Sequence, residues 1–183
     1  MSKILIVGGG AAGMMAGVYL ARAGHEVHIL EKNEKLGKKV YITGKGRCNV
    51  TNNCEVEDLL RAVMTNSKFL YSAFYTFNSQ DMMALLEEAG VPLKTERGNR
   101  VFPQSDRSSD IIRGLERLMK KYDVHVRFRS EVREILTKDG AATGISLADG
   151  EVQNADAVVV ATGGLSYPTT GSTGDGYRFA RET

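Results

Sequence analysis

The sequence predicts an α/β fold in which a parallel sheet is joined by a three-stranded antiparallel β-meander. Two apolar runs, residues 4–7 and 157–161, each lead directly into a glycine turn, which is typical of buried parallel strands that end at one edge of a sheet. The meander is predicted by alternating segments that flank Asp139-Gly140 and Asp149-Gly150, because Asp-Gly is a strong signal for a tight hairpin.

The first 31 residues follow a βαβ pattern. The strand over 4–7 runs into the glycines at 8–10, and apolar residues at spacings of three and four predict a helix over 11–23. Gly24 stands where a glycine commonly ends a helix. Residues 27–30 are then expected to form a second strand parallel to the first.

The rest of the chain follows a mixed pattern after a central loop over 43–54 that has neither helical nor strand periodicity. Ser79 is expected to cap the third of the helices that follow. The expected elements are, in order, helices over 56–64, 68–77 and 80–89, a hairpin over 94–102, a helix over 109–121, strands over 124–128, 132–137, 142–147, 151–154 and 157–161, and a helix that opens at 174–176. Because this last helix runs to Thr183 without a cap or a return strand, we expect residues 1–183 to be one domain at the N-terminal end of a longer protein.

Composition limits the possible partners. The chain has 24 Lys+Arg against 22 Asp+Glu, so it has no electrostatic footprint for nucleic acid or an anionic membrane. It has no apolar run approaching 18 residues and no signal peptide, which favours a cytoplasmic location and no membrane partner. Two cysteines in a cytoplasmic protein are expected to be thiols rather than a structural disulfide.

Gly8, Gly10 and Gly13 form the G-x-G-x-x-G fingerprint, with Ala11 and Ala12 between the last two. The first glycine permits a tight turn, the second lets the backbone approach a pyrophosphate, and the third lets helix and strand pack closely. The N-terminus of the helix offers free N–H groups and a positive dipole end to phosphates. The fingerprint therefore predicts a dinucleotide site.

Glu31 ends the second strand, where a carboxylate can accept hydrogen bonds from the ribose hydroxyls of an adenosine and would repel a 2′-phosphate. The fingerprint is common to FAD and NAD, and the residues after Glu31 favour FAD. Lys32, the run Gly37-Lys38-Lys39 and the glycine-rich loop are expected where a chain follows an extended dinucleotide from its pyrophosphate to its ring. The bland alternative for Lys38 and Lys39 is a solvated surface.

The second glycine turn, formed by Ala161, Thr162 and Gly163, is expected at the same sheet edge as Gly8, so that one ligand lies between two glycine turns. At Val132, the start of the meander, the backbone could meet an adenine edge. A plain core valine is the alternative for that position.

The central loop contains both cysteines, Cys48 and Cys54, which raises the alternatives of a redox pair and a zinc site. Their spacing and the lack of a helix start disfavour a redox pair. The three histidines are expected on or beside strands, away from the loop, so no metal is predicted. The preferred interpretation is a cofactor loop in which Gly46 admits the ligand, Arg47 and Asn49 hydrogen-bond it, and Cys48 packs nearby.

The aromatic residues of the segment 68–77 allow two interpretations. They could face a substrate, although the more common role of such a helix is to form part of a core, which is the interpretation that we favour. The residues concerned are Phe69, Tyr71, Phe74, Tyr75 and Phe77.

The motifs GGGAAG, EK, LGKKVYITGKGRCNVTN and ATGGLSYPTTGSTGDGY together resemble the bacterial NAD(P)/FAD-dependent oxidoreductases of the aminoacetone-oxidase-like family, which also includes a reductase of unsaturated bile-acid intermediates. The resemblance spans essentially the whole chain. It implies a glutathione-reductase-type Rossmann FAD-binding domain, interrupted in full-length members by a second domain. The family usually has glycine where this chain has Lys45, a change that is tolerated if position 45 points to solvent.

The resemblance also implies FAD contacts at individual positions and an acidic turn near the flavin at Asp175. The implied contacts are Gly8, Gly10, Gly13, Glu31, Lys32, Lys39, Arg47, Cys48, Asn49, Val132, Thr162 and Gly163.

Two functional classes remain after this comparison. In the first, the parent protein is a flavin oxidoreductase that passes a hydride between a small organic substrate and FAD, with oxygen or NAD(P)H as the second redox partner. In the second, the chain is a dinucleotide-binding module without catalysis of its own. No side chain is identified as a general base, which is consistent with chemistry carried by the cofactor. Arg47 is expected to stabilise the negative charge of the reduced ring.

Overall fold

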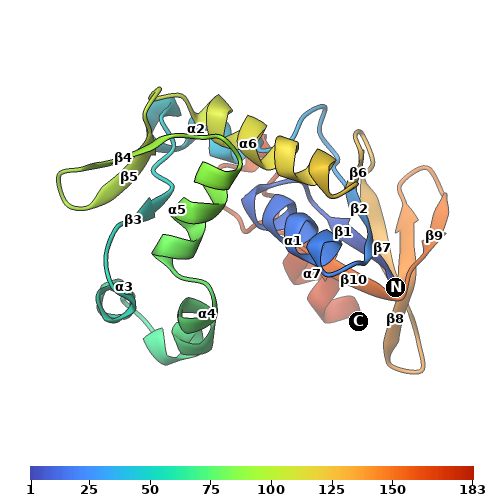
Figure 1. Ribbon diagram of the computed structural model, residues 1–183. Helices are drawn as coiled ribbons and strands as arrows, with labels where there is room; N and C mark the ends of the chain where they lie inside the picture. Colours follow the sequence, from blue (N-terminus) through green and yellow to red (C-terminus); the bar gives the residue numbers. More distant parts are fainter. The chain divides into compact units, whose positions relative to one another are not determined.

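The computed structural model covers residues 1–183 and confirms the predicted α/β fold, with a parallel sheet and an antiparallel meander (Figure 1). The chain divides into two compact units. The sheet unit comprises Met1–Val40 and Leu115–Thr183, and the loop unit comprises Tyr41–Gly114. None of the helices is long and apolar enough to cross a membrane.

The sheet unit is built on four parallel strands in the order β10-β1-β2-β6. In register, Val7 lies opposite both Leu30 and Val160. Three strands therefore reach the same edge of the sheet with their carboxyl ends. The strands are β1 Lys3–Val7, β2 Glu26–Leu30, β6 His125–Arg127 and β10 Ala157–Val160.

Helix α1, Ala11–Arg22, connects β1 to β2 and packs on the sheet. Its Met14 and Val18 are fully buried. A Cβ at Gly17 would lie 3.1 Å from Cδ1 of Ile29, so the backbone of the helix lies close to β2. The helix ends before Gly24, whose φ of +84° confirms the predicted glycine stop.

The meander is formed by β7 Val132–Lys138, β8 Ala141–Leu147 and β9 Val152–Asn154. With α7, Asp175–Glu182, it supplies side chains to a core cluster against β1 and β2. Because these apolar side chains leave water together, each contributes roughly 1.5–3 kcal/mol to folding. The cluster contains Leu5, Val7, Leu30, Val132, Ile145, Leu147 and Phe179.

The loop unit has a three-stranded antiparallel sheet in the order β3-β5-β4, with short helices. Helix α6, Ser108–Lys121, begins in this unit and ends in the sheet unit. Helix α2, Lys38–Ile42, begins in the sheet unit and ends in the loop unit. The other elements of the loop unit are the 3-10 turn η1 Thr43–Gly46, β3 Thr51–Asn52, α3 Val56–Ala62, the 3-10 turn η2 Ser67–Leu70, α4 Tyr71–Thr76, α5 Ser79–Glu88, β4 Leu93–Glu96 and β5 Arg100–Pro103. A further 3-10 turn, η3 Pro168–Thr170, precedes α7 in the sheet unit.

Three details of the sequence prediction are wrong in the loop unit. The central loop contains η1 and β3, and Thr51 pairs with Val101 of β5. The helix expected over 68–77 is split into η2 and α4. The cap of α5 is Asn78 rather than Ser79, because the Asn78 side chain accepts hydrogen bonds from the backbone N–H groups of Gln80 and Asp81.

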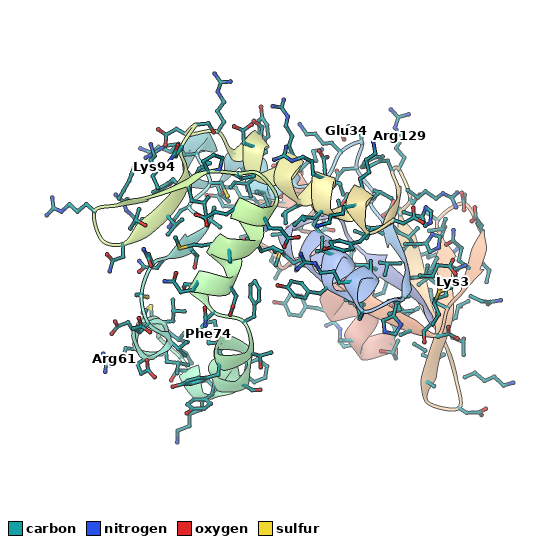
Figure 2. The ribbon with its side chains drawn as sticks, viewed as in Figure 1. Lys3, Glu34, Arg61, Phe74, Lys94 and Arg129 are labelled. Carbon is teal, nitrogen blue, oxygen red and sulfur yellow. The ribbon has the colours of Figure 1, made fainter.

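The aromatic residues around α4 do not form the expected core. Phe69, Tyr71 and Tyr75 are 80%, 56% and 48% exposed. Helix α4 has six residues, none of them buried, so it is too short to bury one continuous face against a neighbour. Figure 2 labels Phe74 on this helix and Arg61 on α3. The core interpretation is therefore wrong for the three exposed rings.

The histidine and cysteine interpretations are consistent with the structure. His28 on β2 and His125 on β6 are strand residues whose ring centroids lie 4.8 Å apart. Cys48 and Cys54 are both free thiols.

Candidate FAD-binding site

The fingerprint turn is closed by backbone contacts that leave no room for side chains at two of its glycines. Gly8 has a φ of +107°, and its N–H donates to the carbonyl of Leu30 at 2.8 Å. A Cβ at Gly8 would lie 2.6 Å from the carbonyl oxygen of Ala161, and a Cβ at Gly13 would overlap the carbonyl oxygen of Gly8. These two glycines pack the turn against β10 and α1.

Gly10 differs, because a Cβ there would meet no protein atom within 4 Å. Gly10 is the N-cap of α1, and no side chain caps the N-terminal end of this helix. The residues that follow, Ala11 and Ala12, are exposed. An open position beside uncapped N–H groups at the start of a 12-residue helix fits a pyrophosphate.

Glu31 is buried at the end of β2, with 6% of its surface exposed. Its Oε2 accepts from the N–H of Gly9 at 2.7 Å, and its Oε1 accepts from the N–H and Nδ2 of Asn33 at 2.8 and 2.6 Å. A Cβ at Gly9 would overlap Cδ2 of Leu36 and lie 3.1 Å from Oε2 of Glu31, so a larger residue here would displace one of these side chains. Neither Gly9 nor Asn33 was predicted as a site residue, although Gly9 stands in the middle of the three consecutive glycines at 8–10.

The segment after Glu31 folds back on the fingerprint. The N–H of Gly37 donates to the carbonyl of Gly9 at 2.9 Å. Lys38 donates to Oδ1 of Asn33 at 3.2 Å, and Lys39 donates to the hydroxyl of Ser166 at 3.3 Å. The predicted residues 37–39 therefore lie around the dinucleotide turn, and each lysine has a polar partner.

Lys32 and Asp175 are far apart in sequence and form an ion pair at 2.8 Å. Lys32 also donates to the hydroxyl of Thr173 at 2.8 Å. Burial raises the pKa of Asp175, but hydrogen bonds from Lys32 and Thr173 outweigh that effect, so its pKa lies below the ordinary value. The acidic turn before α7 is thus joined to the end of β2.

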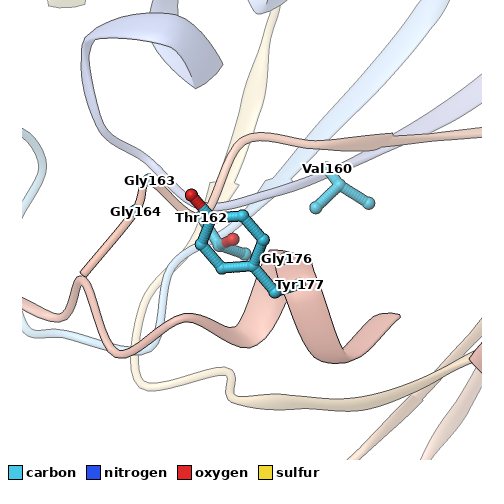
Figure 3. Close-up of a pocket in the computed structure, with 6 residues that line it drawn as sticks. All are labelled: Val160, Thr162, Gly163, Gly164, Gly176 and Tyr177. Carbon is cyan, nitrogen blue, oxygen red and sulfur yellow. The ribbon is translucent and has the colours of Figure 1, made fainter. Parts of the chain in front are cut away.

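The second glycine turn lies beside the first, as predicted. The N–H of Ala161 donates to the carbonyl of Val7 at 2.9 Å, and a Cβ at Gly176 would lie 2.8 Å from the hydroxyl of Thr162. An open pocket of about 360 Å³ adjoins this turn, with the ring of Tyr177 next to it (Figure 3). Thr162 and Gly163 were predicted as site residues, whereas Val160, Gly164, Gly176 and Tyr177 were not, although Gly176 and Tyr177 belong to the GSTGDGY motif. The lining residues are Val160, Thr162, Gly163, Gly164, Gly176 and Tyr177.

Val132 is 6% exposed and belongs to the core cluster. Its side chain is therefore that of a core valine, as the alternative interpretation for this position has it. The proposed contact between its backbone and an adenine edge stays a prediction.

The remaining candidates lie in the loop unit. Arg47 donates to Glu96 at 2.5 Å and to Asp106 at 2.6 and 2.8 Å. Its guanidinium carbon lies 4.2 Å from the centroid of the Phe102 ring. Lys94, labelled on β4 in Figure 2, donates to Asp106 at 2.7 Å. Hydrogen bonds from Arg47 hold the pKa of Glu96 below its usual value, and those from Lys94 and Arg47 do the same for Asp106.

The loop that carries Arg47 has an unusual backbone. Gly46 has a φ of +87°, and Lys45 and Cys48 have φ of +58° and +59°. Burial raises the pKa of the Cys48 thiol, so this cysteine is a packed residue rather than a reactive one. The side-chain amide of Asn49, with its nitrogen turned toward them, donates to the carbonyls of Thr51 and Val101 at 3.1 and 3.2 Å.

The structure thus brings together the candidates of the sheet unit around two adjacent glycine turns. Gly46, Arg47, Cys48 and Asn49 belong to the loop unit.

Comparison with known proteins assigns this arrangement. The HI0933-like protein Rossmann domain matches residues 2–183. The chain is 33% identical over 183 residues to the 3-dehydro-bile acid delta(4,6)-reductase of Clostridium scindens, covering 99% of this chain and 44% of that protein. It is 29% identical over 183 residues to the ribosomal RNA dihydrouridine synthase of Haemophilus influenzae, covering 99% and 45%. The chain therefore spans somewhat less than half the length of these relatives.

Solved structures agree with the fold. The open conformation of a flavocytochrome c3 fumarate reductase superposes with a TM-score of 0.77 at 25% identity, covering 99% of this chain and 40% of that one. A 3-ketosteroid-delta4-(5alpha)-dehydrogenase from Rhodococcus jostii superposes with a TM-score of 0.71 at 18% identity, covering 91% and 46%, which shows the fold alone. With the open Gly10 position, the uncapped helix and Glu31, the family match and the likeness to the 25% identical flavocytochrome identify the cofactor of the domain as FAD. The chain belongs to the HI0933-like family of Rossmann-fold flavoproteins.

Proposed function

We propose that residues 1–183 are the FAD-binding part of a flavin-dependent oxidoreductase that transfers a hydride between a small organic substrate and FAD, with oxygen or NAD(P)H as the second redox partner. The observation that carries this proposal is the pair of glycine turns at one sheet edge, with Glu31 at the end of the strand beside them. The aminoacetone-oxidase-like branch of the family and a cytoplasmic location are parts of the same proposal.

Several candidate residues of the sheet unit have distinct roles in this proposal. The N–H groups at the start of α1 bind the pyrophosphate, and Glu31 accepts a hydrogen bond from the adenosine ribose. Lys32, Lys38 and Lys39 supply positive charge around the dinucleotide. When bound, FAD supplies the hydride chemistry, and the chain supplies binding and electrostatics.

The residues of the loop unit are proposed to act on the flavin part, as the resemblance implies. In the structure, Arg47 and Lys94 face Glu96 and Asp106, two positive against two negative charges. Replacing Arg47 with alanine is expected to lower the flavin reduction potential, because a cation that stabilises the reduced ring is lost. Replacing Glu96 with glutamine is expected to raise the flavin reduction potential, because the positive charge of Arg47 is then neutralised by one carboxylate fewer. Potentials that are equal in both variants and in the wild type would remove this role.

A small-molecule substrate, rather than nucleic acid, is favoured by the nearly balanced charge of the chain, +2 in total. The Clostridium scindens relative is a bile-acid reductase by name. Its counterparts in Haemophilus influenzae and Escherichia coli are named for a reaction on ribosomal RNA, so RNA is the competing substrate class. A substrate screen with the reduced protein should therefore include a planar enone and a uridine-containing ribosomal RNA fragment.

The second candidate function is a dinucleotide-binding module without catalysis. Spectroscopy of the purified protein separates the two. We expect flavin absorbance bands, and bleaching of these bands under anaerobic conditions when NAD(P)H or a reduced substrate is added. A flavin that stays oxidised with every donor would support the module. A colourless protein that refuses added FAD would contradict both the proposed enzyme and the FAD assignment.

A further inference from the structure

We propose that Asn33 is the positioning residue that aims the Glu31 carboxylate at the ribose of the cofactor. This inference rests on the proposed role of Glu31 in FAD binding. It concerns a residue two positions beyond Glu31, outside the glycine fingerprint.

Asn33 makes two of the three protein hydrogen bonds to the Glu31 carboxylate. Both its N–H and its Nδ2 donate to Oε1, at 2.8 and 2.6 Å, while Gly9 alone donates to Oε2, at 2.7 Å. An ionised carboxylate has about four lone-pair sites. Three are therefore filled by the protein, and the orientation of the group decides where the remaining acceptor site points.

The Asn33 side chain is itself fixed from several sides of the sheet unit. Its Oδ1 accepts from Lys38 at 3.2 Å, which orients its Nδ2 toward Glu31. Its backbone carbonyl accepts from the N–H of Arg129 at 3.1 Å. A Cβ at Gly171 would lie 2.8 Å from Nδ2, so the absence of a side chain there leaves the amide its place. These contacts hold one rotamer rather than a mobile surface amide.

The chemistry of the amide is matched to this task. Its nitrogen donates to a carboxylate while its oxygen accepts from an ammonium group. An aspartate at position 33 would place a second carboxylate against Oε1, and an alanine would leave only the backbone donor. Asn33 therefore determines the direction of the Glu31 acceptor without needing to touch the cofactor.

The test compares the affinities of the purified, flavin-free protein for ADP, 2′-deoxy-ADP and 3′-deoxy-ADP. The differences report the contribution of each ribose hydroxyl. In the wild type we expect ADP to bind about tenfold more tightly than at least one deoxy analogue, since a hydrogen bond to a charged group is lost. In Asn33→Ala and Asn33→Asp this preference should fall to about twofold or less. FAD affinity should fall by about tenfold in Asn33→Asp.

Three further variants sharpen the result. In a Glu31→Gln background, Asn33→Ala should have no additional effect on the deoxy preference. Gly171→Ala crowds Nδ2 and should reproduce part of the Asn33→Ala effect in a variant shown to be folded, because its φ of +98° also strains any residue with a Cβ. Asn154→Asp, an exposed residue of β9 in the same unit, is the matched control and should leave the preference at its wild-type value.

The outcomes separate this proposal from the proposed function. An unchanged ADP preference in folded Asn33→Ala, or an equal loss for ADP and both deoxy analogues, would overturn the positioning role, because a purely structural effect weakens all three ligands alike. A wild type that binds ADP with a Glu31-dependent preference but refuses FAD would contradict the proposed function. In that case the Asn33 assignment would still be decided by the ADP measurements.

Discussion

At the residue scale, the glycines of the fingerprint have different surroundings. Gly13→Ala is expected to destabilise the fold by about 1–3 kcal/mol or more, because its Cβ would overlap the backbone of Gly8. Gly10→Ala should leave the fold intact, since no protein atom lies within 4 Å of its Cβ. The new methyl group would instead occupy the space proposed for the pyrophosphate, so FAD affinity should fall.

Urea unfolding and FAD titration of these two variants provide the measurement. Each variant is the control for the other, because both change one glycine of the same turn to alanine. Equal losses of stability in both, or normal FAD binding by Gly10→Ala, would contradict the assignment of separate packing and cofactor roles.

Lys45 stands where the resembled family usually has glycine, and its backbone conformation is unfavourable for a residue with a side chain. It is exposed and has a φ of +58°, a region that costs a residue with a Cβ about 1–2 kcal/mol. Lys45→Gly is therefore expected to raise the free energy of unfolding by about 1 kcal/mol, part of the gain being lost to the greater freedom of glycine in the unfolded chain. Lys120→Gly, at an exposed position in α6, should lower it by about 1 kcal/mol. Equal effects in a denaturation series would show that the backbone at position 45 is not strained.

At the element scale, Arg127 of β6 and Glu151, next to β9, are joined by an ion pair at 2.6 Å. Hydrogen bonds from Arg127 and Gln153 lower the pKa of Glu151 from 4.5 to about 2. Because the pKa is depressed in the folded state, this stabilisation is complete above pH 4.5 and is lost as the pH falls through about 2.

Glu151→Gln should therefore be less stable than the wild type near neutral pH, and the difference should shrink between pH 4.5 and about 2. Denaturant unfolding as a function of pH measures it. Glu134→Gln removes an exposed carboxyl of β7 in the same meander and is the matched control for the loss of one negative charge. A pH-independent difference for Glu151→Gln would show that the ion pair does not stabilise the fold.

Local sequence signals predicted most elements because those elements depend on periodicity and turn residues. The meander followed from two Asp-Gly turns, and Gly140 and Gly150 have the positive φ that such turns require. Strand β3 was missed because two residues carry no periodicity and pair only with distant β5. The cap of α5 was placed one residue late because Asn78 and Ser79 are both good caps, and only the hydrogen bonds distinguish them.

The site was predictable in part for the same reason. Gly8, Gly10, Gly13 and Glu31 belong to a local pattern of fixed spacing. The partners of Arg47 lie 49 and 59 residues away, and no sequence period relates such positions. Asn33 was missed because an isolated asparagine after a strand is common in loops.

At the scale of the whole molecule, cofactor binding should stabilise the fold by mass action. FAD at 100 times its dissociation constant is expected to add about 2.7 kcal/mol to the free energy of unfolding. Thermal unfolding with and without FAD measures this shift, and Gly10→Ala at the same FAD concentration is the control with a smaller shift. An unchanged unfolding temperature in the wild type would show that the folded chain does not bind FAD under those conditions.

The position of β1 in the sheet determines the order in which the sheet can assemble during translation. β1 lies between β2, which follows it closely in the chain, and β10, which begins only at Ala157. During translation, β1 therefore has one neighbour until most of the chain has left the ribosome. Contacts between such distant segments form slowly, and the second glycine turn can reach Gly8 only after β10 has paired. The two glycine turns are thus brought together only after β10 has been made, and a nascent chain that stalls before residue 157 has the fingerprint without its companion turn.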